Sequence, residues 1–315
     1  MARRADFVDD DKLIDLISRL GMQGAASETG YSRRNIDYRR KDIESRRKIK
    51  ITPKGGVHDY STKHPERLTF DIDDGWVLIG SDAHYWPNVI STAHRGFVQA
   101  CKELRPKLVV LNGDVFDGAS VSRHSPIQWE SRPTVQQEIE ACTERLDEIR
   151  KAAKNAQFVW TLGNHDARFE SRLALAAPEY AKVHGVHLKD HFPEWLPCWS
   201  IWVNDEVVIK HRAKSGLHAP FNNTMWAGKS IVTGHLHSQK AMPFTDYNGT
   251  RWGVDCGTLA DTFGPQFTDY MEDGARPWRS GFVALRFQDG ELLQPQLALV
   301  VRDGVIDFMG KLHHV

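Results

Sequence analysis

Residues 108–117 have the sequence Leu-Val-Val-Leu-Asn-Gly-Asp-Val-Phe-Asp, which sets an apolar run directly against two carboxylates. The run at 108–111 has the length of a buried strand, and continuous apolar runs are typical of sheets that are covered on both faces. Gly113 lets the backbone approach closely beside Asp114. We therefore expect a central strand that delivers Asp114 to the carboxyl edge of a sheet, where α/β active sites form.

Four other segments repeat this design, with polar residues placed after an apolar run. They are 76–84 with Asp82 and His84, 158–166 with Gly-Asn-His-Asp, 207–211 with His211, and 231–237 with Gly-His-Leu-His. Amphipathic stretches at 89–104 and 135–155 predict helices between the first runs. The alternation predicts an α/β fold with all ligand loops at one edge. Later runs at 251–255, 281–287 and 297–301 predict a second sheet that closes a sandwich.

The loops together supply two Asp, one Asn and four His, which are ligands for hard or borderline metal ions. Water attacks an anionic phosphoester slowly unless charge is neutralised and hydroxide is supplied at neutral pH. Two cations about 3.5 to 4 Å apart meet both needs. The set therefore predicts a two-metal hydrolytic site with Asp114 as the bridge and with these ligands: Asp82, His84, Asp114, Asn164, His211, His235 and His237.

The ordered motifs resemble those of the calcineurin-like metallophosphoesterase superfamily over about residues 76–258. The resemblance implies a β-sandwich flanked by helices and two divalent metal ions, with Mn expected first and Fe or Zn as alternatives. It implies one ion held by Asp82, His84, Asp114 and His237, and another held by Asp114, Asn164, His211 and His235. His165 would then stabilise the transition state and protonate the leaving oxygen, with Asp166 orienting its ring.

Departures from the family pattern bear on the substrate. Phosphoprotein phosphatases of the superfamily have Asp-Arg-Gly in the second motif and Gly-Asn-His-Glu in the third, whereas here Gly118 follows Asp117 and the third motif ends in Asp166. These strings resemble phosphodiesterases and nucleases more closely. We therefore expect hydrolysis of a phosphodiester, and the basic N-terminal helical segment favours nucleic acid as the substrate. A phosphomonoesterase or a small-nucleotide hydrolase is the alternative.

Several residues beside the motifs are candidates for lesser roles. Arg168, Arg212 and Lys214 are candidates for binding substrate phosphate, although a salt bridge for Arg168 and a solvated loop for the other two fit equally well. His218 is the alternative ligand to His211, because the fourth motif has Arg212 where the family has Gly. Asp117 is expected to orient ligands rather than to bind metal.

Residues 1–55 carry 14 Lys or Arg against 9 Asp or Glu, although the whole chain has 41 of each. Apolar residues at helical spacing predict a first helix that ends at Gly21; a short segment, a turn at Gly30 and a basic helix capped by Ser32 follow. The pattern resembles a helix-turn-helix unit, with these candidate DNA contacts: Arg33, Arg34, Asn35, Arg39 and Arg40. A basic appendage that serves oligomer contacts is the alternative.

We expect three parts: a basic helical unit over 1–50, a linker over 51–68, and the phosphoesterase domain over 69–315. The four cysteines form no Cys-x-x-Cys pair, the N-terminus is charged, and no uncharged apolar stretch approaches about 18 residues. These features favour a cytoplasmic protein with no membrane partner. The layout resembles proteins encoded by bacteriophages, which would place it in host cytoplasm. A DNA-binding protein with an inactive domain is the rival, but all seven ligands are present.

Overall fold

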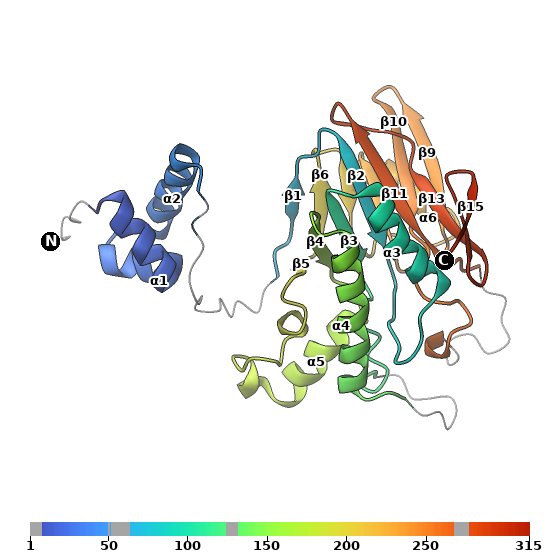
Figure 1. Ribbon diagram of the computed structural model, residues 1–315, viewed down its shortest axis with the longest axis horizontal. Coiled ribbons are helices and arrows are strands. Elements are labelled where there is room, and N and C mark those ends of the chain that lie inside the picture. The colour runs from blue at the N-terminus through green and yellow to red at the C-terminus, as the bar shows by residue number, and fades with distance from the viewer. Residues whose placement is uncertain (1–7, 50, 52–63, 124–131, 268–276) are drawn as a thin grey trace. The chain divides into compact units, whose positions relative to one another are not determined.

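The computed structural model describes residues 8–49, 51, 64–123, 132–267 and 277–315 (Figure 1). The chain separates into two compact units, Met1–Thr62 and Lys63–Val315. Most of the predicted linker, residues 52–63, lies outside the described residues, and its last residue, Leu68, instead begins strand β1. Within the described ranges, no helix is both long and apolar enough to cross a membrane.

The smaller unit consists of helices α1 (Asp10–Thr29) and α2 (Arg33–Arg47). Gly21 has φ 68°, so the predicted first helix and the short segment after it form one element with a kink at the expected residue. Gly30 ends α1 with φ 71°, and the Ser32 side chain caps α2 by accepting a hydrogen bond from the Asn35 backbone N–H. Apolar residues from both helices form a small core, which includes Leu13, Ile17, Ala25, Ile36 and Ile43.

The larger unit is built on two sheets. The smaller sheet has the strand order β1-β6-β7-β8-β10-β9, and the larger has β15-β14-β13-β11-β2-β3-β4-β5 with β12 paired to β11. The strands are β1 (Leu68–Phe70), β2 (Gly75–Gly80), β3 (Leu108–Asn112), β4 (Gln157–Thr161), β5 (Leu196–Cys198), β6 (Ile201–Val203), β7 (Val207–Ile209), β8 (Ser230–Thr233), β9 (Lys240–Asp246), β10 (Gly249–Asp255), β11 (Gly281–Gln288), β12 (Glu291–Leu292), β13 (Gln296–Arg302), β14 (Val305–Phe308) and β15 (Lys311–His314).

Helices cover the outer faces of this sandwich (Figure 1). Helix α3 packs on the larger sheet and against α4, and α6 packs on β8, β9 and β10 of the smaller sheet. The helices are α3 (Thr92–Leu104), α4 (Val135–Ala152), α5 (Asp166–Ala176) and α6 (Ala219–Ala227), with short 3-10 turns η1 (Pro178–Tyr180), η2 (Leu188–Asp190) and η3 (Pro265–Phe267). The α/β sandwich flanked by helices is as predicted.

Strand alternation explains why the central strands are apolar throughout. In β2, Val77 and Ile79 face the core between the sheets, while Leu78 faces the core under the helices. In β3, Val110 faces the core between the sheets, and Val109 faces the core under the helices. Because successive side chains point to opposite faces, a sheet that is covered on both sides needs apolar residues at every position.

The late strands are arranged differently from the prediction that they form a second sheet together. Strand β11 pairs antiparallel with β2, and β13 pairs with β11, so both extend the larger sheet. Only β10 joins the other sheet, where it pairs parallel with β8. The reason is that β11 itself alternates between the two cores, with Leu285 facing the other sheet and Phe282 facing the helices. Such a strand fits in the larger sheet, which is covered on both faces, and it lies there beside β2.

Gln239 links the two sheets through backbone carbonyls. Its buried Nε2 lies 3.2 Å from the Cys256 oxygen after β10, and 3.1 and 2.9 Å from the Phe282 and Ala298 oxygens in β11 and β13. A hydrogen bond within a protein contributes about 0.5–1.5 kcal/mol to stability, and the amide of Gln239 has two N–H donors. The side chain therefore stabilises the sandwich as a whole.

We predict that Gln239→Ala lowers the free energy of unfolding by about 1–3 kcal/mol, because it removes the side-chain hydrogen bonds that link the two sheets. Urea unfolding followed by circular dichroism measures the change. Gln294→Ala, at an exposed position beside β13, is the matched control and should change it by less than about 0.5 kcal/mol. Equal values for the two variants would contradict this role.

Candidate active site

The predicted ligand loops meet at the carboxyl ends of parallel strands from both sheets. Strands β2, β3 and β4 run parallel in the larger sheet, and β7 and β8 run parallel in the smaller one. Backbone hydrogen bonds join the loops: Asp82 N–H donates to the Gly113 carbonyl at 2.9 Å, and Gly234 N–H donates to the His211 carbonyl at 3.0 Å. The site is therefore built where two sheet edges converge.

The backbone is unusually strained where the ligand loops turn. Five predicted ligands have left-handed φ angles between 40° and 73°: Asp82, His84, Asp114, His235 and His237. Such conformations are uncommon for residues other than glycine and cluster at functional sites. Gly163 and Gly234 allow the loops to pack, because a Cβ atom at either position would overlap a carboxylate oxygen of Asp114 or Asp82. The surrounding contacts therefore hold the side chains in place at a conformational cost.

The structure brings the predicted ligands together in overlapping groups. Within each group, the ligand atoms lie within 4.8 Å of one another. Asn164 also belongs to the cluster, since its Oδ1 lies 3.3 Å from His211 Nε2. His211, rather than the alternative His218, is the histidine brought to the cluster. The groups are Asp82, His84 and His237; Asp114, His211 and His235; and His84, Asp114 and His165.

The ring nitrogens are arranged for binding cations. His84 Nδ1 lies 2.8 Å from the Asp117 carboxylate, and His211 Nδ1 lies 2.8 Å from the Asn112 carbonyl. Each contact holds Nδ1 and directs Nε2 into the cluster, where in His211 it meets Asp114 and Asn164. Among the side chains that the structure describes, His84 Nε2 and His237 Nδ1 are buried with no hydrogen-bond partner. Because such groups are costly to bury, these residues fit a metal centre.

The carboxylates in the cluster are held in their ionised form. Burial raises the pKa of Asp114, but the charge of His211 and its hydrogen bond outweigh burial and hold the pKa well below its usual range. Burial likewise opposes ionisation of Asp82, and the charges of His237 and His211 lower its pKa. Two buried carboxylates among imidazoles form a donor set that suits divalent ions of the first transition row.

Asp117, not Asp166, contacts the ring of His165. His165 Nδ1 lies 3.0 Å from Asp117 Oδ1, the oxygen that also meets His84. Burial lowers the pKa of His165, but the hydrogen bond to Asp117 and the charges of Asp114 and Asp117 raise it overall. Arg168 donates to the Asp117 carbonyl at 3.0 Å, and its Nη2 lies 3.0 Å from His165 Nε2. The expectation that Asp117 orients ligands matches this geometry.

The prediction that Asp166 orients His165 requires correction, because its carboxylate is occupied by N–H groups of other residues. It accepts hydrogen bonds of 2.9–3.0 Å from five donors: the backbone of Asp114, Val115, Phe116 and Gly163, and Trp160 Nε1. Burial and the charge of Asp114 raise the pKa of Asp166 to about 6, against the effect of the N–H groups. Asp166 therefore shapes the loop that carries Asp114.

Two organising residues were not identified from the sequence. Asn112 bonds through its carbonyl to His211 and Ser81, and through its side chain to Thr161. Glu138 in α4 accepts hydrogen bonds from Gly118 and Ala119, at 2.8 and 3.0 Å, in the loop after Asp117. The position of Asn112 directly before the Gly-Asp motif was an available signal. Glu138 had none, because its contacts join residues 19 and 20 positions apart.

The predicted phosphate contacts differ in their surroundings. Arg168 lies beside His165, as described above. Arg212 and Lys214 are exposed in the loop that follows His211. Lys214 Nζ lies 4.8 Å from the ring centroid of Trp226, an exposed residue of α6. All three cations therefore come from segments that begin at a predicted metal ligand.

A sandwich with this cluster at its edge defines a class of metal-dependent phosphoesterases. The sequence pattern of the calcineurin-like phosphoesterases matches residues 76–255, more than half of the chain. The chain therefore belongs to the calcineurin-like phosphoesterase family and is a metal-dependent hydrolase of phosphoesters.

Individual proteins show more distant likenesses. The gene 54 protein of Mycobacterium phage L5 is 27% identical over 218 residues, which cover 63% of this chain and 84% of that protein. Zinc-bound Vps29 from Entamoeba histolytica aligns with a TM-score of 0.39 at 14% identity, covering 76% of this chain and 98% of that one. An archaeal phosphodiesterase aligns with a TM-score of 0.36 at 14% identity, covering 70% and 99%.

We predict that Asp166→Asn mainly lowers stability, whereas Asp117→Asn mainly lowers activity. An amide at 166 keeps only one acceptor oxygen for five N–H groups, and it should lower the free energy of unfolding by about 3 kcal/mol. An amide at 117 can still accept from both imidazoles, so its stability loss should be smaller than at 166, while activity falls about 10–100-fold. Urea unfolding and phosphodiester hydrolysis measure the two effects. A stable Asp166→Asn protein would refute the structural role of Asp166.

Proposed function

We propose that the protein hydrolyses a phosphodiester in nucleic acid at a two-metal centre, with Mn²⁺ as the first expectation for both ions. One ion would be held by Asp82, His84, Asp114 and His237. The other would be held by Asp114, Asn164, His211 and His235. The buried ring nitrogens without partners and the ionised carboxylates support this assignment.

The two ions, when bound, supply a hydroxide at neutral pH and neutralise phosphate charge. The residues of the chain provide the remaining functions. In this proposal His165 donates a proton to the leaving oxygen, and Asp117 supports that role because it keeps the pKa of His165 raised and its ring oriented. Arg168 brings a positive charge to the Nε2 face of that ring, where it can bind an oxygen of the phosphate.

The observation that carries the choice of substrate is the position of three cations beside the cluster. Arg168 contacts His165, and Arg212 and Lys214 lie exposed in the loop after His211. The chain as a whole has no net charge, so these cations are not part of a general basic surface. Trp226 is 76% exposed beside Lys214 and offers an aromatic face for a base. Cations and an exposed ring suit a nucleic-acid strand.

The smaller unit is proposed to bind DNA through fewer residues than the sequence indicated. Arg33, Arg34 and Asn35 are exposed at the start of α2. Arg39 instead donates to the Val8 carbonyl at 2.7 Å, and Arg40 forms 3.0 Å ion pairs with Asp37 and Glu44. Arg39 thus ties α2 to the segment before α1, and Arg40 pairs with carboxylates within α2. The proposed DNA contacts therefore do not include Arg39 and Arg40.

We predict that the protein with Mn²⁺ hydrolyses bis(p-nitrophenyl) phosphate at least about tenfold faster, by kcat/KM, than p-nitrophenyl phosphate. The release of nitrophenolate measures both rates, and a chelator should abolish both. A preference for the monoester would instead make the protein a phosphomonoesterase.

The combined variant Asp114→Asn with Asn164→Ala tests the ligands assigned to the metal centre. It removes the proposed bridge and a ligand of one ion, so both turnover and bound metal should be lost. Metal content by inductively coupled plasma mass spectrometry gives the second readout. Full activity in this variant would disprove the assigned ligands.

For the smaller unit, we predict that Arg33→Ala with Arg34→Ala weakens binding of a DNA duplex and lowers the salt dependence of binding by about one to two charges. Fluorescence anisotropy across a salt series measures both quantities. Arg40→Ala should leave the salt dependence unchanged, because Arg40 is committed to Asp37 and Glu44. Unaltered binding in the double variant would exclude this face.

A further inference from the structure

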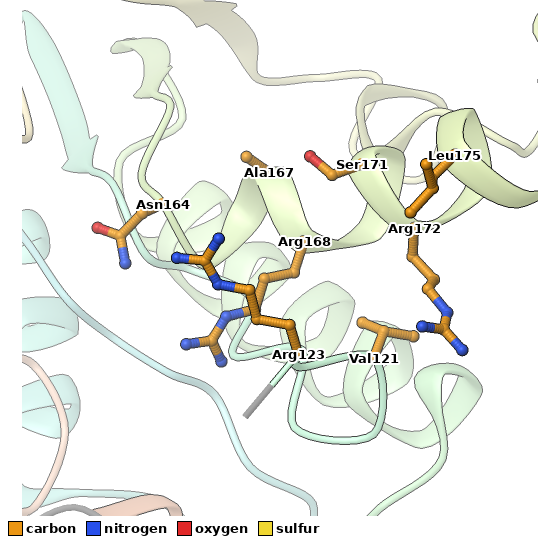
Figure 2. Close-up of a pocket in the computed structure, with 8 residues that line it drawn as sticks. All are labelled: Val121, Arg123, Asn164, Ala167, Arg168, Ser171, Arg172 and Leu175. Carbon is orange, nitrogen blue, oxygen red and sulfur yellow. The ribbon is translucent and has the colours of Figure 1, made fainter. Parts of the chain in front are cut away.

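A basic cavity lies next to the metal cluster and shares Asn164 with it. Helix α5 and the loop after β3 enclose a cavity of about 360 Å³, within the range of small-ligand pockets. Asn164, a proposed metal ligand, forms part of its wall (Figure 2). The cavity is therefore continuous with the reaction centre on one side.

Three arginines line this cavity, and among the lining residues that the structure describes none is acidic. Arg168 and Arg172 come from one face of α5, and Arg123 comes from the loop. Figure 2 shows the guanidinium groups of Arg123 and Arg168 directed to the side of Asn164, and that of Arg172 directed away from it. Ser171 of the same helix also lines the cavity. Positive charge thus extends outward from the cluster along α5.

Two of these arginines are not used by the fold. Across the described residues, neither Arg123 nor Arg172 forms an ion pair, whereas many other arginines of the chain do. Arg168 is committed to His165 and Asp117. Arginines that gather around a cavity repel one another unless negative charge is present, and no described lining residue supplies a carboxylate. This arrangement favours an anionic ligand.

The outer wall of the cavity is apolar. Leu175 is 84% exposed at the end of this face of α5, and Val121 lies in the opposing loop. A ligand that combines a phosphate with a sugar or a base would match both parts, because its phosphate meets the arginines and its apolar faces meet Leu175 and Val121. A free inorganic phosphate would use only the first part.

We propose that this cavity, lined by Arg123, Arg168 and Arg172, binds the phosphate that neighbours the scissile one in a nucleic-acid strand. This inference rests on the proposed hydrolysis of nucleic acid and names a subsite for it. Arg168 joins the subsite to the reaction centre, while Arg123 and Arg172 contact only the neighbouring nucleotide. The enzyme therefore prefers strands with a phosphate on a defined side of the cleaved bond.

The test compares three dinucleotides that differ by one phosphate: TpT, pTpT and TpTp. Their dissociation constants are measured by calorimetry on the full-length Asp114→Asn protein, so that turnover does not interfere. One of the two terminal phosphates should tighten binding at least tenfold, which is about 1.4 kcal/mol. Adding Arg123→Ala and Arg172→Ala should abolish this gain. Adding Arg302→Ala, at an exposed arginine in β13, is the matched control and should preserve it.

The outcomes separate this inference from the proposed function. If neither terminal phosphate tightens binding, or if the gain survives in the variant that lacks Arg123 and Arg172, the subsite is refuted whatever the enzyme hydrolyses. If wild-type protein hydrolyses no diester but the phosphate gain appears and depends on these arginines, the subsite stands and the proposed reaction fails. A kinetic check places Arg123→Ala and Arg172→Ala in the protein with Asp114 intact. The ratio of kcat/KM for pTpT or TpTp to that for TpT should be at least tenfold lower in this variant than in the wild type.

Discussion

The active site depends on one buried carboxylate that binds no metal in our proposal. Asp166 accepts five hydrogen bonds, three of them from consecutive backbone N–H groups of residues 114–116. A sharp loop at the end of a strand leaves such N–H groups without partners, and buried groups of this kind are costly. By satisfying them, Asp166 lets the chain turn directly after β3 with Asp114 in a left-handed conformation. The position of the proposed bridging ligand follows from this contact.

The sandwich supplies the second requirement, which is that ligands from distant segments meet. Loops from the larger sheet bring Asp82, His84, Asp114 and Asn164, and loops from the smaller sheet bring His211, His235 and His237. Hydrogen bonds across the edge, such as that from Thr258 Oγ1 to the Asp82 carbonyl, hold the loops in register. Because the ligands are positioned by strand ends packed on two cores, they lie on the rigid part of the fold.

Charge is distributed around this centre according to two different tasks. Within the cluster, carboxylates are ionised and imidazoles are oriented, which suits cations. Outside it, arginines line α5 and the loop before the undescribed residues 124–131, which suits the phosphates of a strand. In the smaller unit, by contrast, several arginines neutralise local carboxylates, and the basic composition overstates the number of cations available to DNA.

The sequence by itself determined the seven candidate ligands, the central strands and the caps of the basic helices. These features follow from local patterns: apolar runs that end in polar motifs, a glycine at each tight turn, and Ser32 before a helix. Only the tertiary structure decided that Asp117 rather than Asp166 meets His165, that β11 and β13 extend the larger sheet, and that Arg123 shares a cavity with Arg168 and Arg172. Each of these depends on contacts between residues dozens to hundreds of positions apart, and such contacts are set by the packing of the sheets and helices and leave no periodic signal in the sequence.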